Sequence, residues 1–313
     1  MVTYAVRRLV QAVGVLFAVS IVVFILLHLL PGGPARALLG EHANRLAIRS
    51  FDQQYGLLAP LPIQYIDWVG QLLRGNLGYS YDLNESVDTA LAQNLPRTLL
   101  LVGVSTFLAL GLGVAIGTVQ GLRRNGVVDH SMTGFVLAAY SAPSFLLGVV
   151  LIWLFSDVTP LLPSTGPTSL APVWAQIPNL VLPIATLTLV NVALFSRYVR
   201  SSVIDNLLEP YVEMARAKGL SPARIALAHV LPNSLLPVIT IIGLSLPGIL
   251  GGALVTESLF NYPGMGLLFW HAAQTDDFPV LLGTTMVVGV AVVLGSLIAD
   301  LMYAVVDPRV RYV

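Results

Sequence analysis

The clearest pattern along the chain is a series of long segments that contain no Asp, Glu, Lys or Arg. An α-helix needs about 20 predominantly apolar residues to cross the hydrocarbon core of a bilayer. Six uncharged segments are long enough, and they cover residues 9–35, 98–122, 131–156, 158–196, 225–256 and 278–299. The pattern predicts an all-α integral membrane protein with six transmembrane helices, at roughly 9–30, 98–120, 132–155, 179–199, 234–254 and 280–305.

Basic residues set the predicted orientation, because Lys and Arg concentrate in the cytoplasmic loops of membrane proteins. With the N-terminus inside, the short outer loops 156–178 and 255–279 contain no basic residue. The cytoplasmic segments then carry Arg7, Arg8, Arg123, Arg124, Arg197, Arg200, Arg216, Lys218, Arg224, Arg309 and Arg311. The outer segment 31–97 is too long for the rule to apply well. We therefore predict that both termini lie in the cytoplasm, with an extracytoplasmic insert between spans one and two.

The distribution of polar residues divides the chain into two parts. Residues 1–97 are predicted to form the first transmembrane helix plus an extracytoplasmic cap segment, since 31–97 mixes turn residues with enough apolar residues for a small fold with some helix. Residues 98–313 are predicted to form a five-helix core with a cytoplasmic loop at about 205–233. The first span is expected to be retained, because its apolar stretch of about 22 residues is longer than that of a signal peptide.

Glycine and proline recur inside the predicted spans. Gly113 and Gly117 form a GxxxG pair, which lets two helices approach closely. Four prolines are predicted to kink or interrupt spans three to five: Pro143, Pro183, Pro237 and Pro247. Each proline alone is equally consistent with simple packing, but the four together favour a bundle that moves or encloses a path.

Composition narrows the classes of function. Charged residues make up 10% of the chain, whereas a soluble domain carries about 25%. The net charge is zero, so nothing favours nucleic-acid binding. The absence of cysteine excludes disulfides, cysteine-ligated metals and thiol catalysis. The single lysine, Lys218, is followed by Gly219 and not by Ser or Thr. The sequence therefore lacks the Gly-Lys-Ser/Thr loop that cradles ATP phosphates. We therefore predict a chain that is not an enzyme, with any ATP hydrolysis belonging to a partner.

The cytoplasmic loop 200–233 has the strongest local signals. Pro210 suits the first turn of a helix, and Glu213 near that start suits the helix dipole. Gly219 occupies the position of a left-handed C-cap, and Ser221 followed by Pro222 predicts a new N-terminus. The loop is thus predicted to form a short helix at about 210–218, a glycine joint, and a second helix from 222 toward the membrane.

The short helix is predicted to present an apolar face. Tyr211, Met214 and Ala215 share that face, with Ala217 beside them. Outside the bilayer such a face needs cover, which a groove on a partner protein or the lipid interface would supply. Both possibilities remain open from the sequence.

The loop resembles the EAA signature of binding-protein-dependent ABC importer permeases. That signature reads Glu-Ala-Ala, three residues, Gly, nine residues, and Ile-x-Leu-Pro. Glu213, Ala215, Gly219 and the Leu231-Pro232 pair match it, while Met214 and His229 depart from it. A helix accepts methionine readily, so the departure at Met214 leaves the predicted helix intact.

Other segments resemble one branch of that family, the first (B-type) permease subunit of the dipeptide, oligopeptide and nickel importers. The resemblance covers nearly the whole chain in order: Leu-Pro-Gly-Gly-Pro at 30–34, Gly-Asn-Leu-Gly-Tyr-Ser at 75–80, Asn-Leu-Pro-Arg-Thr at 94–98, Glu-Ser-Leu-Phe-Asn-Tyr-Pro-Gly-Met-Gly at 257–266, and Asp-Pro-Arg-Val-Arg at 307–311. It implies a type I ABC importer permease in the bacterial cytoplasmic (inner) membrane.

The resemblance also implies partners and roles. The chain would pair with a second, homologous permease as a heterodimer, with two cytoplasmic ATPase subunits that bind ATP and magnesium, and with an extracytoplasmic substrate-binding lipoprotein. The chain itself would carry no cofactor. The ATPase-coupling residues would be Glu213, Met214, Ala215, Arg216, Gly219, Leu220 and Pro232. Peptides are the commonest cargo of this branch, and relatives carry nickel chelates, glutathione, haem or antimicrobial peptides.

The translocation path is predicted from uncharged polar residues. Ser141, Ser144 and Asn191 are candidates for its lining, since weak uncharged groups suit a passage that must release its cargo. Glu257, Asn261 and Tyr262, just outside span five, are candidates for an outer gate that receives an amino group. The alternative for these three is a solvated turn at the membrane interface.

Three other functions remain open. A secondary transporter would need a coupling-ion site and often has inverted repeats, and the sequence shows neither a mid-membrane acid nor a repeat. An intramembrane enzyme would need a catalytic pair, and no metal-binding His-Glu-x-x-His motif occurs. A passive assembly subunit is compatible with everything above.

Overall fold

The computed structural model describes residues 2–29, 39, 44–54, 56–80, 82–167 and 176–306. The chain forms two compact units. One, here called the N-terminal unit, comprises Val2–Thr98 and Pro263–Leu294; the other, the core unit, comprises Leu99–Tyr262 and Gly295–Val313 together with Met1. The chain passes from one unit to the other after residues 98, 262 and 294, and the last of these points lies inside a helix, so the C-terminal part of the chain contributes to both units. The predicted motif at 307–311 lies outside the described residues.

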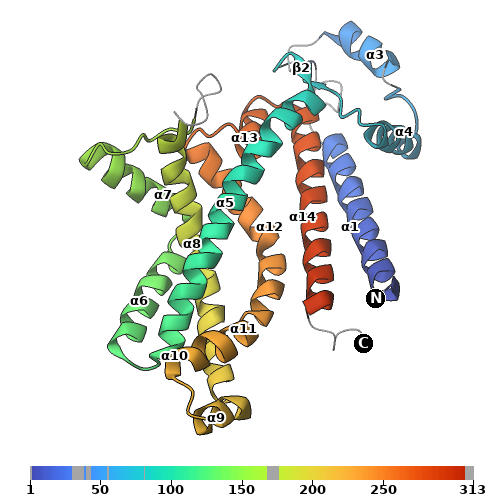
Figure 1. Ribbon diagram of the computed structural model, residues 1–313. Coiled ribbons are helices and arrows are strands. Elements are labelled where there is room, and N and C mark those ends of the chain that lie inside the picture. The colour runs from blue at the N-terminus through green and yellow to red at the C-terminus, as the bar shows by residue number, and fades with distance from the viewer. Residues whose placement is uncertain are drawn as a thin grey trace. The chain divides into compact units, whose positions relative to one another are not determined.

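The N-terminal unit is helical with one small hairpin (Figure 1). Its elements are α1 (Val2–Leu29), α3 (Arg45–Gln54), α4 (Leu61–Leu73), β1 (Tyr79–Ser80), β2 (Glu85–Ser86), the start of α5 (Val87–Leu122), α13 (Met265–Gln274) and the first part of α14 (Phe278–Val306). The two strands pair antiparallel, with Tyr79 opposite Ser86. The cap therefore contains the helix that the sequence predicts.

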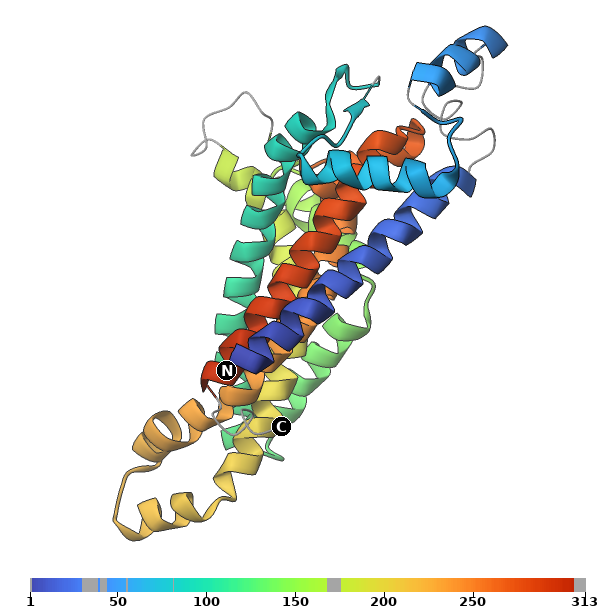
Figure 2. The same cartoon turned by 90° about the vertical axis from the view of Figure 1, so that its right-hand side faces the viewer.

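Aromatic and polar contacts tie the cap to the first span. Figure 2 shows α4 crossing the C-terminal end of α1. Tyr65 on α4 hydrogen-bonds Ser20 on α1 at 2.7 Å and packs edge-on against Phe24. His28 on α1 hydrogen-bonds the Gln64 side chain at 3.0 Å. The polar atoms of these side chains are thus paired by hydrogen bonds between α1 and α4, toward the C-terminal end of α1.

The core unit is built from the remaining helices. They are the rest of α5, α6 (Val127–Ser141), α7 (Ser144–Ile152) with a π-helical extension (Trp153–Val158), α8 (Ile177–Leu207), α9 (Pro210–Ala217), α10 (Pro222–Ile225), a π-helical turn (Ala226–Val230), α11 (Leu231–Ser234), α12 (Leu236–Leu259) and the end of α14. Buried side chains of α5, α8 and α12 form its main apolar cluster, with Phe195 and Leu101 fully buried.

Small residues allow α5 and α8 to approach closely, as the GxxxG pair predicts. A methyl group added at Gly113 would lie 2.7 Å from Phe195 Cβ, and one at Gly117 would lie 2.5 Å from the Ser196 carbonyl oxygen. Gly121, one turn further, approaches Val203 in the same way. The glycine row therefore extends over three successive positions, one more than the predicted pair.

The predicted prolines behave differently from one another. Pro143 lies at the break between α6 and α7, where the chain bends by 104°. Pro183 lies inside α8, and the helix continues through it. Pro237 lies at the start of α12, where its missing N–H costs nothing, and α12 also continues through Pro247. The prediction of a kink or break is therefore confirmed at Pro143, whereas α8 and α12 run past Pro183 and Pro247 as continuous helices.

Every predicted span overlaps one of the helices above. Among the described residues, four helices are long and apolar enough to cross a membrane, and the bent pair α6–α7 makes a fifth if it is one span. Large apolar side chains such as Phe107 and Phe135 face outward, as lipid contact requires. The all-α membrane fold is thus confirmed, and the count of six spans and the orientation stay predictions.

Candidate functional site

The candidate site begins where α8 ends and the chain turns into α9. Glu209 is extended, with ψ of 144°, and Pro210 follows at the first helical position. The Val212 amide donates to the Glu209 carbonyl at 2.9 Å, which closes the first turn. Since proline lacks an N–H that a first turn could not bond in any case, the local sequence starts a new helix here. Helix α9 spans Pro210–Ala217, close to the predicted 210–218.

A glycine joint ends α9. Gly219 has a φ of +73°, the left-handed conformation that favours glycine. Its amide donates to the Arg216 carbonyl at 2.9 Å, and the Leu220 amide donates to the Ala215 carbonyl at 3.2 Å. This pair of bonds is a Schellman motif, which satisfies carbonyls that the helix end leaves free. The predicted C-cap is confirmed.

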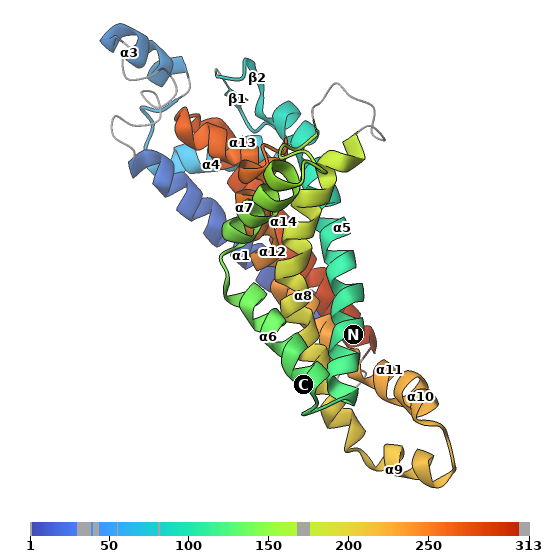
Figure 3. The same cartoon turned by 90° about the vertical axis from the view of Figure 1, so that its left-hand side faces the viewer.

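The second helix begins as the sequence predicts. The Ser221 hydroxyl accepts from the Arg224 amide at 3.4 Å, so Ser221 is the N-cap of α10, and Pro222 follows. The π-helical turn and α11 lead from there back to α12 (Figure 3). The hairpin from α9 to α10, called the coupling hairpin below, therefore consists of two short helices with one left-handed residue between them.

The inner side of the hairpin packs on its own chain. Val212 and Ala215 are buried with α8, α10 and α12 side chains in one apolar cluster, whose buried members are Val199, Val203, Val212, Ala215, Ile225, Val230 and Val238. Tyr211 is partly buried, and its hydroxyl donates to the Asn206 side chain at 2.8 Å. The Asn206 side-chain amide in turn donates to the Ser202 backbone carbonyl at 2.9 Å. Helix α9 is therefore fastened to the end of α8.

The prediction that the apolar face of α9 needs cover from a partner or from lipid is wrong in part. Ala215 and much of Tyr211 are covered by the chain itself, so they need neither a partner groove nor lipid. Val212, which the sequence analysis missed, is the most deeply buried residue of the helix. Its signal was present, since 212 and 215 are three residues apart and so lie on one helix face. Of the residues predicted on or beside the apolar face, Met214 and Ala217 are exposed.

The outer side of the hairpin is open. Glu213, Arg216, Lys218 and Gly219 are exposed, and Met214 is 59% exposed between them. Leu220 is half-buried, while Pro232 on α11 is exposed. The outer side of the hairpin thus presents one acidic group, two basic groups and an apolar thioether. Such a surface suits an ion pair surrounded by apolar contact.

The predicted path residues are separate from the hairpin. Ser141 ends α6 and is exposed, and Ser144 starts α7 on the other side of Pro143. Asn191 is buried in α8, and its side-chain amide donates to the Leu187 carbonyl one turn earlier at 2.8 Å. In the described part of the chain, neither serine hydrogen-bonds to Asn191. Their role in a path stays a prediction.

The predicted outer gate is mostly buried. Glu257 is fully buried and Tyr262 is 2% exposed, whereas Asn261 is exposed with a φ of +47°. The Tyr262 amide donates to the Glu257 carbonyl at 2.8 Å, and the Gly166 amide donates to the Phe260 carbonyl at 2.5 Å. Glu257 and Tyr262 are therefore not part of a solvated turn, which was the alternative to the gate.

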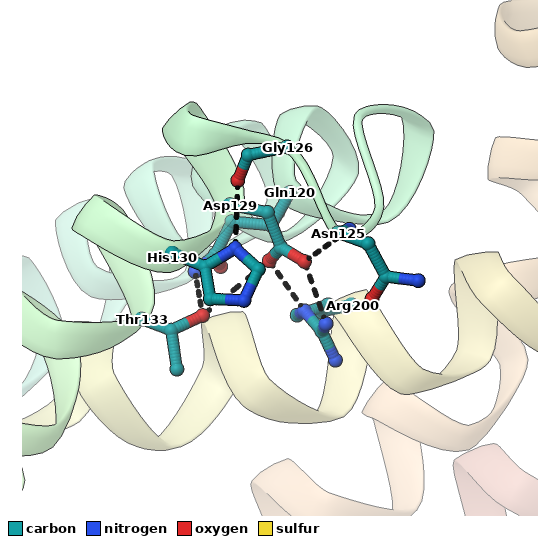
Figure 4. Close-up of polar contacts among 7 residues, drawn as sticks. All are labelled: Gln120, Asn125, Gly126, Asp129, His130, Thr133 and Arg200. Carbon is teal, nitrogen blue, oxygen red and sulfur yellow. Dashed lines mark hydrogen bonds and ion pairs between the residues drawn. The ribbon is translucent and has the colours of Figure 1, made fainter.

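An ion pair with a buried carboxylate lies near the coupling hairpin, and the sequence analysis missed it (Figure 4). The Arg200 guanidinium on α8 donates through two nitrogens, one to each Asp129 carboxylate oxygen, both at 2.7 Å. The Asn125 backbone amide donates to one carboxylate oxygen at 3.0 Å, and the Thr133 hydroxyl donates to the other at 3.4 Å. Gln120 on α5 donates to Thr133 at 3.2 Å. These five residues are called the clasp below.

The clasp had a sequence signal. Asp129 lies in the first turn of α6, and Arg200 lies near the end of α8, each at the predicted inner end of a span. Opposite charges at matching depths of two predicted spans were available to pair, but nothing in the sequence shows which helices are neighbours. Among the described residues, no group of three or more His, Asp or Glu side chains is placed to hold a metal ion.

Comparisons with known proteins address the whole chain. Residues 109–312 match the family model described as binding-protein-dependent transport system inner membrane component, and residues 1–102 match its N-terminal counterpart. A putative peptide permease protein of Brucella suis is 38% identical, with 99% of each chain covered. The oligopeptide transport system permease protein AppB of Bacillus subtilis is 35% identical, and the glutathione transport system permease protein GsiC of Escherichia coli K12 is 34% identical, both over 100% of each chain.

A solved structure has a similar fold. The inward-facing MetNI methionine ABC transporter matches with a TM-score of 0.55 at 19% identity, covering 69% of this chain and 96% of the other. At this identity the likeness supports the fold alone. It indicates that about two thirds of this chain is folded as in that solved chain.

Proposed function

Since the chain belongs to the family of binding-protein-dependent transport system inner membrane components, we propose that it forms half of the translocation path of an ABC importer for peptides. Membership in that family makes the chain a multi-pass protein of the inner membrane and a transport subunit. The peptide cargo is proposed from relatives, whose names include peptide, oligopeptide and glutathione permeases. All three names denote short peptides, so the chemical class is the same although the individual cargo differs.

The observation that carries the proposal is the coupling hairpin. Its inner side is fixed to α8 by an apolar cluster and a hydrogen bond, while its outer side leaves Glu213 and Met214 exposed. A helix that is rigidly attached on one side and open on the other can pass a partner's movement to the bundle. In this role Glu213 pairs with a basic residue of an ATPase, and Met214, Arg216 and Leu220 line the contact.

The remaining partners follow from the family. Binding-protein-dependent transport requires an ATPase and a substrate-binding protein as separate components. We further propose that the second half of the path is a homologous permease and that the two ATPases bind ATP and magnesium. Neither cofactor has a proposed site in this chain, since the only lysine is Lys218 on the hairpin.

The path itself is proposed from the core unit. Ser141 and Ser144 flank the bend at Pro143, and Asn191 lies on the helix that carries the hairpin. Movement of α8 would change what these uncharged groups face. An outer gate at Glu257, Asn261 and Tyr262 would require the segment around Gly166 to move, because that segment now packs on Tyr262.

The test is transport by the full assembly in proteoliposomes, with both permeases, the ATPases and the binding protein. Glu213→Ala and Gly219→Pro are expected to assemble but to lose peptide uptake driven by ATP. Glu209→Ala is the matched control, because Glu209 is an exposed acid on the same loop whose side chain makes no cap bond. ATPase activity stimulated by the binding protein is measured in parallel with uptake.

The outcomes separate the open functions. Loss of uptake in both variants with an unchanged control supports the coupling role. Uptake by the wild type without ATPases, driven by an ion gradient, would identify a secondary transporter and refute the proposal. If the full assembly imports peptides and an assembly without this chain imports them equally well, the chain is a passive assembly subunit.

A further inference from the structure

The clasp joins three elements of the core unit at one carboxylate. Asp129 comes from α6, Arg200 from α8, and Asn125 from the turn between α5 and α6. The Asp129 side chain is 3% exposed and that of Arg200 is 30% exposed. Both carboxylate oxygens carry two hydrogen bonds, so the buried charge is fully paired. Removing one partner of such a pair leaves the other charge buried and uncompensated.

The geometry of the pair resists rotation. A guanidinium that binds a carboxylate through two parallel bonds fixes the angle between the two side chains, whereas a single contact would leave a pivot. Here Nε and one terminal nitrogen of Arg200 each bind one oxygen at 2.7 Å. Helix α6 is therefore held to α8 in angle as well as in distance.

The same stretch of α8 carries the coupling hairpin. Val199 and Val203, on either side of Arg200 in the sequence, are buried against Val212 and Ala215 of α9. Further along, Asn206 holds the Tyr211 hydroxyl at 2.8 Å. The last two turns of α8 thus contact α9 on one side and the clasp on another.

Helix α5 completes this body. Gly117 and Gly121 bring its backbone against Ser196, Arg200 and Val203 of α8. Deeper along α6, Val136 and Ala139 pack on Ala193. At its far end α6 stops at the bend before Pro143, so the body joined by the clasp ends at a break in the chain.

We propose that the Asp129–Arg200 pair is a positioning element of the transport cycle, which makes α6 and the end of α5 move with α8 when the coupling hairpin is displaced. This rests on the proposed function of the hairpin. The alternative is a pair that only stabilises the fold. The two differ in what they change, since a positioning element alters the uptake obtained per ATP hydrolysed, whereas a stabilising pair alters only the amount of assembled transporter.

The test uses the full assembly in proteoliposomes, with the number of peptides imported per ATP hydrolysed as the readout. Asp129→Asn removes the charge, Arg200→Lys keeps the charge but loses the two-bond fork, and the double variant Asp129→Arg/Arg200→Asp restores a pair of reversed order. Asp205→Asn is the matched control, because Asp205 is an exposed acid on the same helix end outside the clasp. Arg197→Gln is the control for loss of a basic residue at an α6–α8 contact that lacks the two-bond fork, since the Arg197 guanidinium lies over the Tyr140 ring, 5.1 Å from its centroid.

Both single variants are expected to assemble and hydrolyse ATP, with the uptake per ATP lowered about fivefold or more, the size of a typical coupling between sites. The double variant is expected to recover part of that loss, and the controls are expected to match the wild type. A wild-type ratio in assembled Asp129→Asn and Arg200→Lys would overturn the inference while leaving the proposed function in place. Failure of every clasp variant to assemble would assign the pair to folding and would overturn it as well. If the wild type itself shows no ATP-driven uptake, it is the proposed function that fails.

Discussion

The close approach of α5 to α8 predicts that Gly117→Ala is destabilising although alanine is the better helix former. A methyl group at this position would lie 2.5 Å from the Ser196 carbonyl oxygen, 2.7 Å from Val199 Cβ and 3.0 Å from the Arg200 amide nitrogen. Real Cβ atoms essentially never approach another atom within 3.0 Å. Two of these neighbours are backbone atoms, so the only relief is a movement of α8 as a whole.

The magnitude follows from two opposing terms. Replacing glycine by alanine inside a helix gains about 1 kcal/mol from propensity. Forcing an extra methyl group into a packed site costs about 1–3 kcal/mol. Gly111 provides the matched control, since it lies on the same helix and an added methyl group there meets nothing within 4 Å. The propensity gain is common to both variants, so their difference in free energy of unfolding isolates the packing cost, about 1–3 kcal/mol.

The assay is thermal unfolding of the purified chain in one detergent, with Gly111→Ala and Gly117→Ala measured side by side. A cost of this size corresponds to a difference in melting temperature of roughly 2–12 °C, at about 2–4 °C per kcal/mol for larger chains. Gly111→Ala is expected at or above the wild type and Gly117→Ala below it. Equal melting temperatures for the two variants would show that α5 and α8 are not packed through their backbones at this position, and the reasoning about the glycine row would be refuted.

Three further predictions concern the joint, the path and the cap. Gly219→Ala is expected to cost about 1–2 kcal/mol because of its positive φ alone, since a methyl group there meets no atom within 4 Å. Gly219→Asn is expected to cost less, because asparagine adopts the left-handed conformation more readily, and chemical denaturation of the two variants checks this ranking. Asn191→Ala is expected to lower peptide uptake while binding-protein-stimulated ATP hydrolysis continues, and unchanged uptake would remove Asn191 from the path. Burial raises the pKa of Asp277 above its ordinary 3.8, against the opposing effect of the Ser80 hydrogen bond and with a contribution from nearby Asp82. Because the folded state then binds the proton more tightly than the unfolded state, stability is expected to fall as pH rises from about 3.8 through the raised pKa, and Asp277→Asn should flatten that slope in melting temperatures measured between pH 4 and 7.

The local elements could be predicted because their causes are local. Long apolar runs position the membrane helices, and Pro210, Gly219 and Ser221 position the ends of α9 and α10. Each of these signals acts within about one helical turn, through a missing N–H, a left-handed φ or a capping hydroxyl. No knowledge of neighbouring helices is needed to interpret them.

The sides of the helices were harder to predict, because they depend on which elements are neighbours. Val212 and Ala215 pack inward only because α8 and α10 lie beside α9. The clasp is a clearer case, since Asp129 and Arg200 are 71 positions apart in the chain. Proline effects were similarly context-dependent. Pro143 coincides with a bend, whereas Pro183 is accommodated in a continuous helix, where other groups must bond the carbonyl that it leaves free.

Helix α8 links these separate observations, because its length exceeds what the membrane requires. Its 31 residues extend about 46 Å at 1.5 Å per residue, against about 30 Å of hydrocarbon. One end of α8 must therefore project beyond the apolar layer, and the end that carries Arg200 is the more polar one. There the charged pair avoids the cost of a charge in lipid, and α9 can meet a soluble partner.

Unbroken helix then connects that end to the candidate path. Asn191 lies nine residues before Arg200, about 13 Å along the axis, and no proline or glycine interrupts α8 between Pro183 and Leu207. A displacement applied at α9 and transmitted through the cluster around Val203 therefore reaches Asn191 without a joint that could absorb it. A place where it can be absorbed is the bend at Pro143 beyond α6, which adjoins Ser141 and Ser144 of the proposed path, whereas α8 runs through Pro183 as a continuous helix. We therefore expect a displacement of α9 to move Asn191 together with α8 and to change what Ser144 faces at the bend, which is how the proposed path would open or close.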